Sequence, residues 1–157
     1  MNSSINIFNS NLAEINITYR NKQKYSEMRK VTSSNDAEEI LRSIWSDQIE
    51  YREEFVILCL NRANKVLGYS RISSGGTTGT VADPKIIFQI ALKSNASSII
   101  LAHNHPSGNT DPSEADKKLT TKLKEAGSLL DIPVLDHIIL VADSYRSLAD
   151  EGGMTAP

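Results

Sequence analysis

The sequence has few of the features that mark secreted or membrane proteins. Its single cysteine, Cys59, leaves no partner for a disulfide within the chain. No apolar run approaches the roughly 18–20 residues needed to cross a bilayer. The first residues lack the basic start and apolar core of a signal peptide. We therefore expect a cytoplasmic protein with no membrane partner.

The sequence also lacks an excess of charge of either sign. Its 17 basic and 19 acidic residues give a net charge of −2. Nucleic-acid-binding domains usually carry a basic excess, so the total charge predicts little association with DNA. The residues 20–30 form a local exception with five Lys and Arg. We interpret this stretch as a solvated loop, or alternatively as a contact for an anionic partner.

Internal repeats and low-complexity blocks are absent, and no glycine spacing matches a phosphate-binding motif. The glycine-rich loop at 73–80 is therefore assigned a conformational role. What remains is ordinary for a globular chain, with 157 residues, 39% hydrophobic and 23% charged. We predict an N-terminal extension over 1–33 with one strand at 12–19, a single domain over 34–150, and a tail over 151–157.

Capping signals place the starts of two helices. The first has Asn35 and Glu38 at the spacing of a capping box, with Ser34 as an alternative N-cap. The second has Asp83 as its N-cap and Pro84 at its first helical position. Each start is followed by apolar residues at intervals of three and four, which is typical of an amphipathic helix.

The remaining segments alternate between one further helix and short apolar runs. The helix begins at Ser113, and its periodicity predicts an inward face of Ala115, Leu119, Leu123, Ala126, Leu129 and Leu130. The apolar runs predict strands at 55–60, 66–70, 96–102, 133–141 and 145–148. Helices separated by core strands predict an α/β fold with a mixed β-sheet covered by helices on both faces.

Two of the three histidines follow a predicted core strand. His103 and His105 are two positions apart, so on an extended chain they point to the same side. Asp116 lies at the start of the next helix, where the positive end of the helix dipole stabilises a carboxylate. These groups suit a hydrolytic zinc site, which needs three protein ligands and room for water. Alternatively, Ser113 and Asp116 form only a capping box.

The spacing His103-x-His105-x7-Ser113-x2-Asp116 resembles the motif of JAMM (MPN+) metalloproteases. The sequence from His103 to Gly108 looks like that of the RadC-like JAB branch of the family. The resemblance implies a cytidine-deaminase-like fold and one zinc ion per chain, held by His103, His105 and Asp116. It implies that Ser113 stabilises the oxyanion.

The resemblance also implies a glutamate base at the start of a core strand. Glu53 and Glu54 are adjacent candidates, and only one of two neighbours on a strand can face a given site. RadC-like chains typically read Arg-Glu-x-Phe here, which favours Glu53.

Some features depart from the family or stay open. Full-length RadC proteins resemble this chain only in their C-terminal part and carry a helix-hairpin-helix region for which residues 1–33 are too short. Asn104 replaces the Ser or Thr found between the histidines of deubiquitinating relatives, although Asn is usual in the RadC-like branch. Asp136 and His137 point to opposite faces of a strand. One of them is expected to orient a ligand histidine, unless both are only satisfied polar groups.

These observations leave three hypotheses about function. The first is a zinc-dependent hydrolase that cleaves peptide or isopeptide bonds in an unknown protein or peptide substrate. The second is a non-catalytic RadC-like binding module in a DNA-repair or mobile-element complex. The third is direct binding or hydrolysis of nucleic acid, which the near-neutral charge disfavours.

Overall fold

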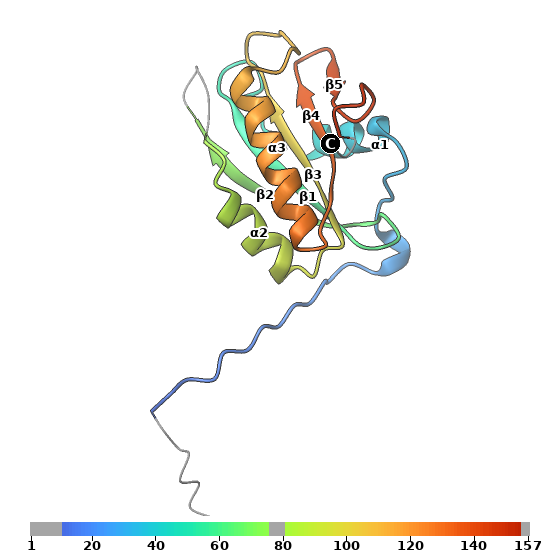
Figure 1. Cartoon of the computed structure of the whole chain (residues 1–157). Coiled ribbons are helices and arrows are strands. Elements are labelled where there is room, and N and C mark those ends of the chain that lie inside the picture. The colour runs from blue at the N-terminus through green and yellow to red at the C-terminus, as the bar shows by residue number, and fades with distance from the viewer. Residues whose placement is uncertain (1–10, 76–80, 155–157) are drawn as a thin grey trace, which may run out of the picture.

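The computed structural model describes residues 11–75 and 81–154 (Figure 1). In chain order its elements are η1 (Tyr25–Glu27), α1 (Ser34–Ile44), β1 (Glu54–Leu60), β2 (Val66–Ser74), α2 (Pro84–Lys93), β3 (Ser98–Asn104), α3 (Glu114–Leu129), β4 (Val134–Leu140) and β5 (Tyr145–Ser147). The strands form one sheet in the order β2-β1-β3-β4-β5. No helix in the described part of the chain has both the length and the hydropathy needed to cross a membrane.

The sheet is mixed, as predicted. β3 and β4 are parallel, whereas β1–β2, β1–β3 and β4–β5 are antiparallel. α2 and α3 cover one face and α1 covers the other (Figure 1). The predicted α/β architecture, with helices on both faces of a mixed sheet, is confirmed.

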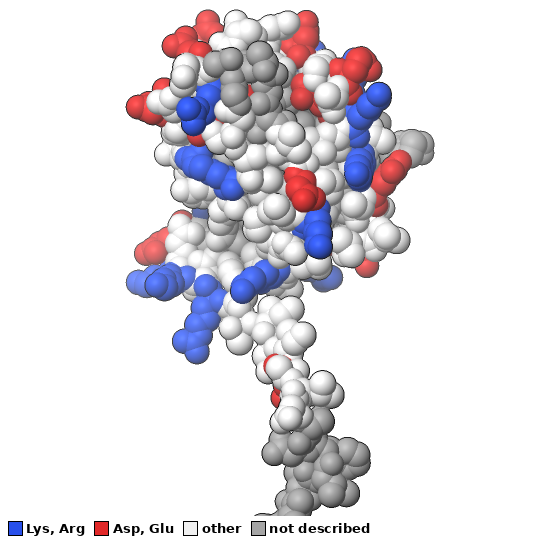
Figure 2. Space-filling view, turned by 90° about the vertical axis from the view of Figure 1, so that its left-hand side faces the viewer, with Lys and Arg blue, Asp and Glu red and all other residues white. Residues whose placement is uncertain are grey.

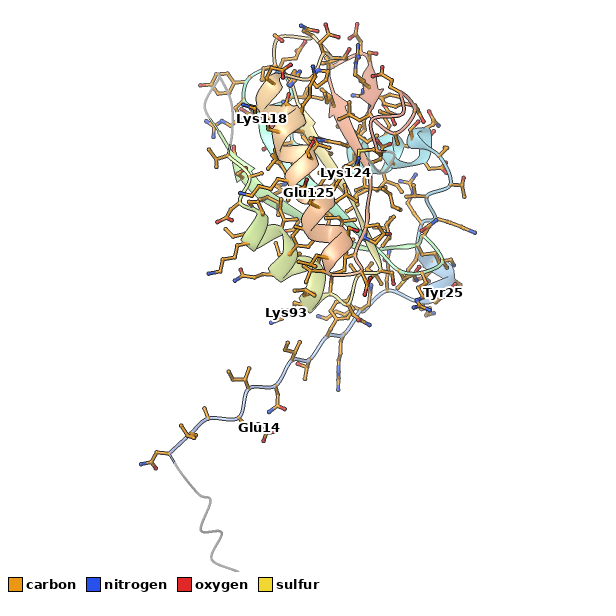
Figure 3. All side chains as sticks on the ribbon, viewed as in Figure 1. Glu14, Tyr25, Lys93, Lys118, Lys124 and Glu125 are labelled. Atoms are coloured by element: carbon orange, nitrogen blue, oxygen red, sulfur yellow. The ribbon has the colours of Figure 1, made fainter. Side chains whose placement is uncertain are left out.

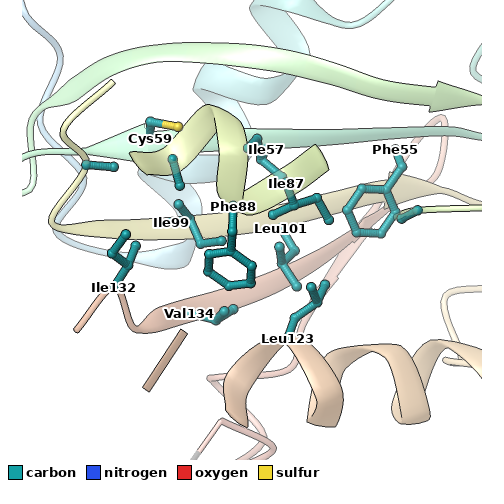
Figure 4. Close-up of a cluster of buried hydrophobic side chains, with 13 residues drawn as sticks. Phe55, Ile57, Cys59, Ile87, Phe88, Ile99, Leu101, Leu123, Ile132 and Val134 are labelled. Carbon is teal, nitrogen blue, oxygen red and sulfur yellow. The ribbon is translucent and has the colours of Figure 1, made fainter. Parts of the chain in front are cut away.

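β1 and β3 are buried over their whole length, because helices cover both of their faces. Side-chain alternation divides their residues between two hydrophobic clusters. Phe55 and Ile57 belong to the cluster under α2 and α3, whereas Val56 and Leu58 belong to the cluster under α1. Figure 4 shows the first cluster, with Phe88 of α2 among its packed side chains. The parity of a β1 residue therefore decides which face it reaches.

The caps of α1 and α2 test the predicted helix starts. The prediction for α1 was wrong by one or two residues, because Ser33 is its N-cap and forms a capping box with Asp36. The side chain of Asn35 instead donates to Glu39 within the helix. For α2 the prediction is confirmed: Asp83 accepts a hydrogen bond from the backbone of residue 85, and Pro84 is the first helical residue.

The predicted inward face of α3 is confirmed for Leu119, Leu123 and Ala126, which pack against the cluster under α2 and α3, and it is wrong for Ala115, Leu129 and Leu130, which are exposed. Thr120, Leu123 and Gly127 are its buried residues, whereas Leu129 is 86% exposed. Figure 3 shows the opposite, charged side of the helix, which carries Lys118 and Glu125. Apolar periodicity missed two of the three buried positions because a threonine and a glycine occupy them.

The strand predicted at 12–19 was wrong. These residues form no strand in the structure, and Leu12 and Ile15 are 83% and 89% exposed. An alternating pattern needs a neighbouring strand to pair with, and this segment extends away from the folded body (Figure 1). The chain joins the body at Asn21, whose side chain donates to the carbonyl of Leu67, and at buried Val31.

Charge is unevenly distributed although the total is close to zero. Figure 2 shows Lys and Arg side chains gathered at the lower end of one face, where the extended segment leaves the body. Segment 20–30, which contains five basic residues, connects the extended segment to the body. Contact of this segment with an anionic partner stays a prediction. Residues 76–80 of the predicted glycine-rich loop and the last residues, 155–157, lie outside the described residues, whereas Ser73 and Ser74 belong to β2.

Gly127 allows α3 to approach the turn that leads into β4. Its carbonyl accepts from the backbone N–H of Ile132, and a Cβ at this position would collide with the backbone carbonyl oxygen of Ile132. We expect Gly127→Ala to destabilise the fold by about 2 kcal/mol in urea unfolding, because overpacking outweighs the better helix propensity of alanine. Gly68→Ala, which meets no atom within 4 Å, is the control. Equal effects of the two substitutions would contradict this account.

Candidate metal centre

The two motif histidines lie at the carboxyl end of β3. His103 belongs to the strand and is 2% exposed, and His105 follows it and is half-buried. Their Nε2 atoms are 2.9 Å apart. The ring of Phe55, which pairs with His103 across β1 and β3, is stacked parallel to the His103 ring. Strand alternation and this contact hold both imidazoles on the α3 side of the sheet.

The tautomer of His105 follows from a backbone contact. Its Nδ1 lies 2.7 Å from the carbonyl oxygen of Asn109. A carbonyl oxygen only accepts hydrogen bonds, so Nδ1 carries the hydrogen. The lone pair of a neutral His105 is then on Nε2, the atom that faces His103.

Asp116 reaches the histidines from the first turn of α3. Its Oδ1 lies 3.3 Å from Nε2 of His103, and its Oδ2 lies 3.3 Å from Nε2 of His105. Ser113 and Asp116 also form a capping box, in which Oδ2 accepts from the Ser113 backbone and Ser113 Oγ accepts from the Asp116 backbone. Helix capping alone would account for Ser113 and Asp116. The same cap also holds the Asp116 carboxylate close to the imidazoles.

The structure separates the two candidate glutamates. Glu53 Oε1 lies 3.8 Å from Nε2 of His105 and 4.0 Å from Nε2 of His103. Glu54 is buried, accepts from Ser46 and pairs with Arg71. Adjacent residues of an extended chain point to opposite faces, so only Glu53 shares the face of the histidines.

Asn104 has a structural role that the sequence did not reveal. Its side chain is fully buried, accepts from the backbone N–H of Glu54, and donates to the carbonyls of Ile49 and Arg52. These three bonds fix the chain that leads into β1 and therefore the position of Glu53. Asparagine suits the position because its amide both donates and accepts.

The donor atoms have a spacing close to that of ligands around one metal ion. Ligands about 2.0–2.2 Å from a tetrahedral ion stand roughly 3.3–3.6 Å apart. The two imidazole nitrogens and the Asp116 oxygens are 2.9–3.3 Å apart. One donor atom from each of Glu53, His103 and His105 also lies within 4.8 Å of the others. Glu53 is farther from the nitrogens than Asp116, which suits a group that acts through water.

The electrostatics favour a charged carboxylate beside the histidines. Burial alone would raise the pKa of Asp116, but the neighbouring imidazoles of His103 and His105 lower it well below its usual range. The hydrogen bond with Asp116 raises the pKa of His105. Burial lowers the pKa of His137 well below that of an ordinary imidazole, so this side chain is neutral at pH 7.

Asp136 and His137 do point to opposite faces, as predicted. Asp136 accepts hydrogen bonds from Ser147 and from the backbone of Ala149, and it therefore ties β4 to β5 and the turn that follows. His137 is fully buried, and its Nε2 lies 2.7 Å from Nδ1 of His103. Only His137 touches the site.

An open groove of about 880 Å³ leads to these groups. Its lining includes the segment 73–75 at the end of β2 and residues of the loop 105–111. Glu53, Ser113 and Asp116 also line it, so these side chains are accessible from the groove.

Comparison with known proteins agrees with this architecture. The profile of the RadC-like JAB domain family matches residues 31–154. A UPF0758 protein of Flavobacterium johnsoniae is 44% identical over 126 residues, which are 80% of this chain and 54% of that protein. A UPF0758 protein of Staphylococcus haemolyticus is 41% identical over 82% of this chain and 55% of its own length. The chain therefore spans about half the length of the curated relatives it matches.

The raised pKa of His105 predicts how pH affects the metal-free chain. Protonated His105 stabilises the fold beside Asp116, so this contribution is complete below about pH 6.5 and is lost as pH rises through the raised pKa. Zinc needs the deprotonated ring, so stabilisation by zinc should grow over the same range. Melting temperatures with EDTA and with zinc between pH 6 and 9 measure both trends. A His105→Asn variant with the same profiles as the wild type would contradict the assignment.

Loss of the Asn104 side chain should destabilise the fold. Asn104→Ala leaves the buried N–H of Glu54 and the carbonyls of Ile49 and Arg52 without this partner, and we expect a loss of about 3 kcal/mol in urea unfolding. Asn35→Ala is the control, because exposed Asn35 bonds only to Glu39 on its own helix. If both substitutions cost less than about 0.5 kcal/mol, the three bonds do not hold the entry to β1.

Proposed function

The chain belongs to the RadC-like JAB domain family, and from this premise we propose that it is a zinc-dependent hydrolase of peptide or isopeptide bonds. The observation that carries the proposal is the convergence of His103, His105 and Asp116 beside Glu53 in an open groove. A purely structural zinc site would need a fourth protein ligand, whereas a hydrolytic site keeps one position for water.

His103, His105 and Asp116 are the proposed zinc ligands. When bound, zinc would polarise the scissile carbonyl and lower the pKa of a water towards about 7. The Nδ1–H bond of His105 to Asn109 directs the lone pair on Nε2 inward. The capping box holds the carboxylate of Asp116 in place before any metal arrives.

Glu53 is the proposed general base. Its carboxylate lines the groove and lies 3.8 Å from the nearest imidazole nitrogen, so that one water in the groove can contact both groups. In this role Glu53 takes a proton from the attacking water and delivers it to the nitrogen of the leaving amine. The carbonyl of Glu53 accepts from the backbone of Gly75, which anchors its main chain.

Ser113 is the proposed donor to the oxyanion. Its Oγ accepts from the backbone of Asp116, so the hydroxyl hydrogen remains able to donate to an oxygen in the groove. A donor already fixed in place stabilises the developing negative charge without reorganisation. Ser113 therefore combines helix capping with a contact to the reacting group.

Two adjacent glutamates provide a matched test. Glu53→Gln should bind zinc like the wild type and lower kcat about 10²–10⁴-fold, because only proton transfer is lost. Glu54→Gln should retain turnover, since Glu54 faces α1 and not the groove. The assay incubates the zinc-loaded chain with a pool of proteome-derived peptides and a pool of lysine-linked isopeptides. Mass spectrometry then detects newly released amines.

The same assay separates the alternatives. Cleavage by a rigorously metal-free wild type, or equal activity of the two glutamate variants, would contradict the mechanism. A chain that takes up no zinc in elemental analysis and cleaves neither pool is instead a non-catalytic binding module.

A further inference from the structure

A buried chain of hydrogen bonds connects two of the proposed zinc ligands behind the groove. The hydroxyl of Thr120 lies 2.7 Å from the main-chain carbonyl oxygen of Asp116 and 2.6 Å from Nδ1 of His137. Nε2 of His137 lies 2.7 Å from Nδ1 of His103. Thr120, His137 and His103 are each at most 3% exposed, so water does not compete for these contacts.

Only one assignment of donors and acceptors is consistent with these hydrogen bonds. The carbonyl of Asp116 can only accept, so it takes the single hydroxyl hydrogen of Thr120. Thr120 Oγ must then accept from His137, which places the hydrogen of the neutral His137 ring on Nδ1. The remaining lone pair of His137 is on Nε2, and it can only accept from Nδ1–H of His103.

We infer that Thr120 and His137 are positioning residues, which hold His103 in the tautomer with a hydrogen on Nδ1 and a lone pair on Nε2. That lone pair faces Nε2 of His105 and the carboxylate of Asp116. The tautomer of His103 is inferred from the contacts above alone. Its role in binding zinc rests on the proposed function.

The two histidines are therefore fixed in different ways. His105 donates to a backbone carbonyl in an exposed loop. His103 instead depends on side chains from α3 and β4, so the packing of the helix on the sheet determines its tautomer. The first hydrogen bond in this series joins the hydroxyl of Thr120 to the main-chain carbonyl of Asp116, one turn earlier on the same helix.

Thr120 has a matched control on its own helix. Thr121 makes the same type of hydroxyl bond, to the carbonyl of Lys117, but it is exposed and contacts no histidine. We compare Thr120→Val, Thr120→Ser and Thr121→Val. Valine keeps the volume of threonine and loses the hydroxyl, whereas serine keeps the hydroxyl.

Two measurements follow the effect. Long-range ¹H–¹⁵N NMR of the ¹⁵N-labelled, metal-free chain reports which nitrogen of each histidine carries hydrogen. Competition with a chromophoric chelator reports the affinity for zinc. We expect Nδ1–H on His103 and His137 in the wild type, and loss of this pattern in Thr120→Val with about 10–100-fold weaker zinc binding. Thr120→Ser and Thr121→Val should resemble the wild type.

The outcomes separate this inference from the proposed function. Nε2–H on His103 in the metal-free wild type overturns the inference without any variant. Thr120→Val with the tautomers and zinc affinity of Thr121→Val overturns it as well. If the wild type shows the expected tautomers and Thr120→Val loses them, but neither chain binds zinc, the positioning role stands and the proposed metal centre fails.

Discussion

The cap of α3 is the interaction on which the rest of the site depends. One carboxylate, that of Asp116, accepts from the backbone of Ser113 and lies 3.3 Å from both imidazoles. The same carboxylate therefore caps the helix and contacts the histidines of the proposed metal centre. The main-chain carbonyl of Asp116 also receives the hydroxyl of Thr120, which leads to His103 through His137. A shift of this helix start by one residue would displace all of these contacts together.

A second set of contacts joins the strands that carry the remaining groups. Asn104, between the two histidines, binds the backbone on either side of Glu53. Phe55, two residues after Glu53, stacks on His103. The position of Glu53 relative to the histidines is thus set by the pairing of β1 with β3 and by one buried amide. The contacts of Asn104 and Phe55 lie in the body of the fold and not in the groove.

The sequence predicted the fold and the main groups of the site because both follow from local patterns. Strand alternation placed His103 and His105 on one side, and fixed motif spacing brought in Ser113 and Asp116. What it missed depends on tertiary neighbours. Thr120 has no local signal, since a threonine in a helix usually indicates an exposed position. The segment 12–19 has a strand pattern but no partner strand, and pairing is a property of the fold.

The alternation of β1 determines which of two glutamates is the proposed base. Glu53 and Glu54 are chemically equivalent, and a slip of one residue in β1 would exchange their faces. The same slip would move Phe55 and Ile57 out of the cluster under α2 and α3. Every side chain of the strand would then face the opposite side of the sheet. The hydrophobic core thus selects between two identical acids. A designer who transfers this site to another scaffold would have to transfer the apolar sequence of the strand along with the histidines.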